Sequence, residues 1–426
     1  MKKIYVLGAI MLITGCATQH LPAVVDMPYC DANITGPAVE LTQVERTDST
    51  TELTFTTMYD YCDDDETFFE LGNEIHLVSG YYKAPLKKLR PLTNIGSKKN
   101  NKVSTDKISM PTGVPVQFKM VFPALPADCE TVDLVQKKDG RVMNSIWGID
   151  LTGTRSPSEF PADIPAELLQ FDFATGNLPG IVRKDGAVKI HAHVAAWRDW
   201  MGRDISFVVN TIDDTQQRIK SHLNDYGVVD IEIPLKGTAE IVAEIHPYNV
   251  YADFYADPDE EINLYILPSN HSDAQRLVRP LGVTDGKYRN IPDMMHKLFL
   301  FHEYADTLMN NKTDVHDYFA SMMKIHSDGL DSIQARNFAP DMQKAARALE
   351  DLKLMYRTGN LKKYFANTVV ATPVADAGYA FSFRPEQLKQ IRESIDFTNP
   401  LLELISIGNP GARTRFLQAK ELILAE

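Results

Sequence analysis

Two histidines stand two positions apart in the segment Lys189-Ile190-His191-Ala192-His193. Alternate side chains of a β-strand point to the same face, so two imidazoles with this spacing can bind one metal ion. The neighbouring sequence supplies no assignable third ligand, and a polar strand face also accounts for the pair. We therefore predict no metal site.

Other groups of reactive side chains lack the spacing that calcium binding or catalysis needs. The acidic segments 60–66 and 257–261 have no EF-hand pattern, and we interpret them as a solvated loop and a hairpin turn. His302-Glu303 lacks the second histidine of a zinc-protease motif. His271-Ser272-Asp273 has the residue types of a triad, but adjacency in sequence is not the geometry of a triad. The sequence thus predicts no catalytic or cofactor-binding residue, and a protein without enzymatic activity is the favoured interpretation.

One cysteine directly follows an apolar run. Two lysines precede this run, residues 4–13, which has the length of a secretory signal rather than of a membrane span. Ile13-Thr14-Gly15-Cys16 then resembles a bacterial lipobox, in which small residues fit the peptidase cleft and the thiol accepts diacylglycerol. The resemblance implies a signal peptide over residues 1–15 and acyl chains on Cys16 that anchor the mature protein. An ordinary signal peptide followed by an unrelated cysteine is the alternative.

Residues 81–102 form a basic segment inside an acidic chain, whose formal net charge is −13. In a domain tethered near a membrane, these cations are candidates for contact with anionic head groups. Lysines on an edge strand that prevent strand pairing are the alternative. The cations are Lys83, Lys87, Lys88, Arg90, Lys98, Lys99 and Lys102.

The composition is that of a globular protein with more than one domain. The chain has 426 residues, of which 44% are hydrophobic and 24% are charged. Its negative charge disfavours nucleic-acid binding, because little counterion release would be gained. Cys30, Cys62 and Cys129 allow one disulfide or remain thiols, and no Cys-x-x-Cys motif is present.

Alternating apolar and polar residues, as in Thr51-Glu52-Leu53-Thr54-Phe55-Thr56, predict β structure in the first part of the chain. Later the apolar period becomes helical, with prolines where first turns begin. The predicted fold class is multidomain β plus α. We expect a tether over residues 16–37, a β-sandwich over 38–153, a linker over 154–180, a second and smaller sandwich-like β domain over 181–268, and an all-α domain over 269–426.

Three short motifs carry a resemblance to one family of envelope proteins. They are Val121-Phe122-Pro123-Ala124-Leu125-Pro126, Ser145-Ile146-Trp147-Gly148-Ile149-Asp150-Leu151 and Phe397-Thr398-Asn399-Pro400. They resemble the N-terminal region of the TlpA-like thiol–disulfide lipoproteins of Bacteroidetes, in which a thioredoxin domain with a reactive Cys-x-x-Cys follows. The resemblance implies the accessory β and helical units without the catalytic domain, because these 426 residues contain no such motif.

These features together predict a lipoprotein of the outer membrane, facing the periplasm or the cell surface. Ala17 follows Cys16, in place of the aspartate that retains many lipoproteins at the inner membrane. We expect a non-catalytic binding or scaffolding module whose partners are the membrane, through the lipid anchor, and another envelope protein. The alternative is an accessory part of a TlpA-like thiol–disulfide oxidoreductase system, either truncated or working with a separate thioredoxin protein.

Overall fold

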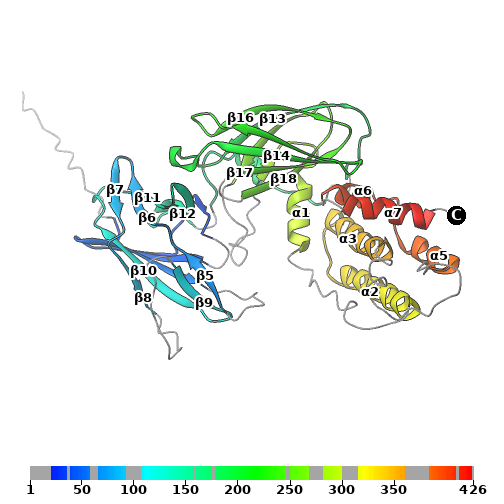
Figure 1. Cartoon of the computed structure of the whole chain (residues 1–426), viewed down its shortest axis with the longest axis horizontal. Coiled ribbons are helices and arrows are strands. Elements are labelled where there is room, and N and C mark those ends of the chain that lie inside the picture. Colours follow the sequence, from blue (N-terminus) through cyan, green and yellow to red (C-terminus); the bar gives the residue numbers. More distant parts are fainter. Residues whose placement is uncertain are drawn as a thin grey trace, which may run out of the picture.

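The structure is a computed structural model in which two β domains are followed by a helical domain (Figure 1). The predicted fold class, multidomain β plus α, is confirmed. Within the described part of the chain, no helix is long and apolar enough to cross a bilayer. The described residues are 21–35, 39–57, 66–92, 107–156, 159–174, 178–245, 250–267, 282–299, 315–359, 383–408 and 412–424.

The first β domain is a sandwich of two five-stranded sheets. The strands of one sheet are, in order, β1 (Val24–Asp26), β3 (Val39–Arg46), β4 (Thr50–Thr57), β10 (Val116–Pro123) and β8 (Lys88–Pro91). The strands of the other are β2 (Ala32–Asn33), β12 (Arg141–Asp150), β11 (Thr131–Lys138), β6 (Glu74–Ser79) and β7 (Tyr82–Pro85). A further antiparallel pair consists of β5 (Glu66–Glu70) and β9 (Lys107–Pro111).

The core of this sandwich lies between its two sheets. Phe55 of β4 and Phe118 of β10 stack with ring centroids 5.0 Å apart. They belong to the same buried cluster as Leu77 of β6 and Leu134 of β11. The alternation of apolar side chains along each strand therefore buries one face of each sheet against the other.

The second β domain is a sandwich of two four-stranded sheets. The strands of one sheet are, in order, β16 (Val228–Leu235), β13 (Gly186–Val194), β19 (Glu261–Ile266) and β20 (Gly282–Thr284). The strands of the other are β15 (Gln216–His222), β14 (Asp204–Thr211), β17 (Ala239–Ile245) and β18 (Val250–Ala256). The 3₁₀ turn η2 (Asp199–Met201) stands between β13 and β14.

The β domains include residues that we expected to form the tether and the linker. Strands β1 and β2 lie within the expected tether, but each pairs with one sheet of the first sandwich. Val25, Tyr29 and Ala32 of this segment are buried. In the expected linker, η1 (Ala166–Leu169) places Leu168 in a cluster with Ala195 of the second β domain. Strand β20 pairs with β19 beyond the expected end of that domain at residue 268.

The helical domain contains α1 (Asn290–Phe299), α2 (Val315–Ala335), α3 (Pro340–Gly359), α5 (Pro385–Ser394), α6 (Pro400–Ile407) and α7 (Ala412–Leu424). Prolines begin α5 and α6, where the missing amide hydrogen costs nothing. Asn399 caps α6 by accepting a hydrogen bond from the amide of Leu401 over 3.1 Å. Apolar faces of these helices form a core of their own around Met322, Leu354 and Phe416.

Candidate functional site

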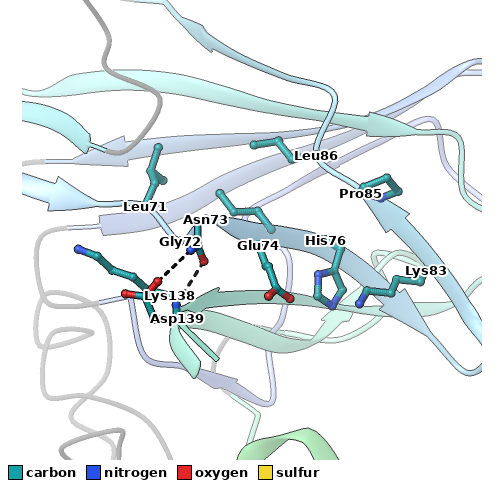
Figure 2. A pocket seen from close by; sticks show the side chains of 11 residues that line it. Leu71, Gly72, Asn73, Glu74, His76, Lys83, Pro85, Leu86, Lys138 and Asp139 are labelled. Carbon is teal, nitrogen blue, oxygen red and sulfur yellow. Dashed lines mark hydrogen bonds between the residues drawn. The ribbon is translucent and has the colours of Figure 1, made fainter. Parts of the chain in front are cut away.

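A cleft of about 640 Å³ opens beside the start of β6 in the first sandwich (Figure 2). Its walls come from the segment between β5 and β6, from β7 and the residue after it, and from the β11–β12 turn. Sites for small ligands commonly have volumes of about 300–1,000 Å³, so the cleft has the size of a binding site. Its lining residues are Leu71, Gly72, Asn73, Glu74, Ile75, His76, Lys83, Pro85, Leu86, Lys138 and Asp139.

Gly72 brings the segment between β5 and β6 into close contact with β11. Its amide donates a hydrogen bond to Oε1 of the buried Gln136 over 3.3 Å. A Cβ at this position would lie 2.5 Å from the carbonyl oxygen of Lys137. The wall of the cleft therefore requires glycine at residue 72.

Asn73 fixes the opposite wall by binding the β11–β12 turn. Its Nδ2 donates to Oδ1 of Asp139 over 3.1 Å, and the amide of Asp139 donates back to Oδ1 of Asn73 over 3.3 Å (Figure 2). Asp139 and Gly140 have φ angles of +53° and +80°. Two consecutive left-handed residues are typical of the two-residue turn that closes a hairpin, so the turn chemistry presents Asp139 to the cleft.

His76 is a neutral imidazole in the wall of the cleft. Burial, together with the charges of Lys83 and Lys137, lowers the pKa of His76 to about 4. A neutral imidazole offers one hydrogen-bond donor and one acceptor. His76 is therefore suited to bind a polar ligand at neutral pH.

The charged side chains of the cleft carry both signs. Lys83 and Lys138 line the same opening as the carboxylates of Glu74 and Asp139 (Figure 2). Lys138 also forms an ion pair with Glu70 at 2.8 Å, and its hydrogen bond and charge lower the pKa of Glu70. The cleft thus offers both hydrogen-bonding and charged groups to a polar ligand.

A second polar cluster joins the two β domains. Nε of Arg198 lies 3.3 Å from Oδ2 of Asp133, and its Nη2 lies 3.2 Å from Oδ2 of Asp31. Asp133 also accepts hydrogen bonds from the amide of Gly148 at 2.8 Å and from the indole of Trp200 at 3.2 Å. Burial still raises the pKa of Asp133, although Arg198 opposes this shift. These residues hold the first β domain against the loop that follows β13.

Four of the candidate surface cations lie on the edges of the first sandwich. Lys83 is on β7, the edge strand of one sheet, and Lys88 and Arg90 are on β8, the edge strand of the other. Lys87 lies between these strands, and Arg90 forms an ion pair with Glu52 at 3.3 Å. Edge strands with lysine and proline resist pairing with other chains, so this position favours the edge-protecting interpretation of part of the segment.

The histidine pair does not converge on one ligand. Nδ1 of His191 lies 2.6 Å from Oδ1 of Asp230, whereas Nε2 of His193 lies 3.6 Å from Oδ2 of Asp163. The ring of His193 also contacts Tyr265 edge-on. Among the described residues, no group of three or more histidine, cysteine, aspartate or glutamate side chains is placed to hold a metal ion.

Two of the cysteines are thiols in the structure. Cys30 is half-buried and donates to the carbonyl of Pro28 over 3.7 Å, and the buried Cys129 donates to the carbonyl of Thr131 over 3.2 Å. Other sequence candidates lie outside the described residues. These are Cys16, Cys62, Lys98, Lys99, Lys102, the acidic residues 60–65, His271-Ser272-Asp273 and His302-Glu303.

The cleft itself was not predicted from the sequence. Asn73 and Asp139 are 66 positions apart, and only the pairing of β6 with β11 brings them together. The dipeptide Asp139-Gly140 between two alternating runs was the readable signal, since it is typical of a hairpin turn. It locates the turn but does not indicate which distant segment faces it.

Searches against protein-family models and against curated proteins find no match to this chain. The likeness to TlpA-like lipoproteins therefore depends on the short motifs described above. In the structure, the motif around Trp147 lies on β12, where the two β domains meet.

Proposed function

We propose that this protein is an outer-membrane lipoprotein, anchored by acyl chains on Cys16, that works as a non-catalytic binding or scaffolding module. The supporting observation is that buried contacts join each domain to the next. Ala32 and Trp147 of the first β domain share one hydrophobic cluster with Val188 and Met201 of the second. A scaffold must hold its parts in a fixed relation, and a continuous core provides this.

The contact between the second β domain and the helical domain is also buried. Arg413 of α7 is 1% exposed, and its Nε donates to the carbonyl of Ile212 over 2.8 Å. Its Nη1 donates to Ser406 over 2.8 Å, and its Nη2 donates to Glu403 of α6 over 2.8 Å. The hydrogen bond to Ile212 crosses from α7 to the second β domain, and Ser406 and Glu403 of the helical domain hold the guanidinium in place, so this buried contact supports a rigid junction.

The cleft beside His76 gives this module a place for a ligand or for a segment of a partner. Its mixed charges and the apolar side chains of Leu71, Ile75 and Leu86 suit a polar molecule with an apolar part. The cleft lies in the first β domain, which is the domain nearest Cys16 in the chain.

Cell fractionation of two cysteine variants tests the proposal. The variant Cys16→Ser should leave the membrane fraction or accumulate as precursor, because serine cannot form the thioether to diacylglycerol. The variant Cys30→Ser is the matched control and should remain in the membrane fraction. If Cys16→Ser is processed and membrane-bound like the unchanged protein, the lipoprotein proposal is wrong.

A further inference from the structure

We propose that the β6–β7 end of the first sandwich rests on the surface of an anionic bilayer. In this contact Tyr81 lies at the membrane interface, and Lys83, Lys87 and Lys88 face the head groups. The inference rests on the proposed lipid anchor at Cys16 and adds which surface of the protein the anchor holds against the membrane.

The chain between the anchor and the first strand is short. Strand β1 begins at Val24, eight positions after Cys16. Even fully extended, eight residues span at most about 29 Å. A lipid on Cys16 therefore keeps the first sandwich within that distance of the bilayer.

Hydrogen bonds connect the point where this tether enters the domain to strand β7. The amide of Arg46 donates to the carbonyl of Ala23 over 2.7 Å, and Nη2 of Arg46 donates to the carbonyl of Pro126 over 2.9 Å. Two residues before Pro126, the carbonyl of Ala124 accepts the hydroxyl of Tyr82 over 2.7 Å. The turn that precedes Tyr82 thus lies at the same end of the sandwich as the tether.

Tyr81 is fully exposed at this turn, with a relative accessibility of 110%. It follows Gly80, whose φ of +56° forms the tight turn between β6 and β7. A tyrosine has an apolar ring and a polar tip, and such side chains favour the boundary between membrane and water. Edge protection explains Lys83 on β7 and Lys88 on β8 but gives no reason for an aromatic ring at the tip.

The three lysines lie near the same end. Lys83 is exposed on β7, one residue after Tyr82. The amide of Lys87 donates to the carbonyl of Val121 over 2.8 Å, and Lys88 pairs with Val121, two positions from Pro123 at the end of β10. Anionic lipids attract cations near their surface, so these side chains complement the head groups.

Acidic residues limit the strength of this contact. Asp48 lies in the β3–β4 turn at this end, because Thr50 pairs with Pro123. Asp128 is exposed in the loop that follows β10. Electrostatic attraction alone is therefore opposed, and the contact requires both the tyrosine and the lysines.

The orientation has a consequence for the rest of the molecule. Figure 1 shows β7 at one end of the long axis, with α7 and the C-terminus at the other. A bilayer contact at β7 would direct the helical domain away from the membrane, where it could meet a partner.

Lysine reactivity on vesicles tests the inference. The full chain, produced in a bacterium that lipidates its own lipoproteins, is placed in vesicles of phosphatidylglycerol and phosphatidylcholine, or of phosphatidylcholine alone. Acetylation rates are then measured for each lysine by mass spectrometry. On the anionic vesicles, the acetylation rates of Lys83, Lys87 and Lys88 should be lower than on the neutral ones by a factor of about three or more. Lys324 and Lys389, whose side chains are 73% and 64% exposed on the helical domain, should react equally on both.

A matched pair of variants tests the role of the tyrosine. Tyr81→Ser should lose most of the protection of the three lysines. Tyr226→Ser, which changes a tyrosine that is 79% exposed in the second β domain, should keep it. Neither substitution removes a buried side chain, so both variants should fold.

The same samples distinguish failure of the inference from failure of the proposed function. The mass of the N-terminal peptide reports whether Cys16 carries lipid. If Cys16 is lipidated and the three lysines react equally on both vesicles, or if Lys324 and Lys389 are protected instead, the orientation is wrong and the anchor stands. If Cys16 carries no lipid, both are wrong. Unchanged protection in Tyr81→Ser would contradict the place given to the tyrosine.

Discussion

The indole N–H of Trp147 donates a hydrogen bond to the backbone carbonyl of Ala196 over 3.0 Å, and this bond joins the two β domains. Trp147 is fully buried on β12 of the first domain, and Trp200 packs edge-on against it with ring centroids 5.4 Å apart. The two sandwiches cannot separate without exposing this ring to water. The proposed scaffold function therefore depends directly on this contact.

Replacing Trp147 with phenylalanine should destabilise the protein by about 1–3 kcal/mol, because the indole hydrogen bond and part of the buried ring volume are lost. The carbonyl of Ala196 keeps one donor, Nη1 of Arg198 at 3.0 Å. Denaturant unfolding of the full chain measures the change. Trp197→Phe is the control, since Nε1 of Trp197 has no hydrogen-bond partner in the described structure. An equal loss of stability in both variants would show that ring volume, not the hydrogen bond, is what matters at residue 147.

Gly148→Ala should destabilise the same junction by about 3 kcal/mol or more. Gly148 has a φ of +63°, and a Cβ there would overlap the carboxylate of Asp31. Gly140→Ala measures the cost of the left-handed backbone conformation alone, because Gly140 has a φ of +80° and open space around it. Thermal or denaturant unfolding should show that Gly140→Ala lowers the free energy of unfolding by only about 1–2 kcal/mol. If Gly148→Ala is no worse than Gly140→Ala, Asp31 does not pack against residue 148.

Glu240 should make stability depend on pH at the contact between β17 and the helical domain. It accepts a hydrogen bond from Asn210 over 2.6 Å, and Gly408 beyond α6 approaches so closely that a Cβ there would lie 2.5 Å from Oε1 of Glu240. Burial raises the pKa of Glu240 to about 7, and the charge of Asp253 acts in the same direction. Between its unfolded pKa of about 4.5 and pH 7, the folded state binds the proton more tightly than the unfolded state does. Stability from this group is therefore lost as the pH rises through that window.

The variant Glu240→Gln should remove this dependence. At pH 8 it should be more stable than the unchanged protein by an amount on the order of 3 kcal/mol, and the difference should vanish near pH 4.5. Glu261→Gln, with an exposed side chain on β19, is the control and should follow the unchanged protein. Melting temperatures measured across this pH range decide the question. Parallel curves for Glu240→Gln and the unchanged protein would contradict the shifted pKa.

Sequence patterns predicted the regular elements better than the segments between them. The prolines at 292, 340 and 385 indicated helix starts that the structure contains, and α7 spans Ala412–Leu424, where a last helix was expected. The helix that begins at Pro400 was not predicted. Strands β1 and β2 have three and two residues, which is too short for a period to be recognised. They are strands because β3 and β12 pair with them. The cleft residues were not predicted for the same reason, since strand register brings Asn73 and Asp139 together.

The protein should not reduce disulfides. Insulin reduction in the presence of a dithiol reductant should proceed at the uncatalysed rate, because thiol–disulfide exchange of this type needs a low-pKa cysteine beside a resolving partner. The buried position of Cys129 agrees with an unreactive thiol. Turnover like that of a thioredoxin, abolished by a serine at residue 30, 62 or 129, would support the rival redox function instead.

The mass of the mature N-terminal peptide tests the proposed lipid anchor most directly. The protein is extracted from membranes of a lipoprotein-processing bacterium, digested and analysed by mass spectrometry. We predict a peptide that begins at Cys16 and carries a diacylglyceryl group on sulfur, with a further acyl chain on the amino group. A membrane-associated protein whose N-terminus lies elsewhere, or whose Cys16 is an unmodified thiol, would contradict the anchored module proposed here.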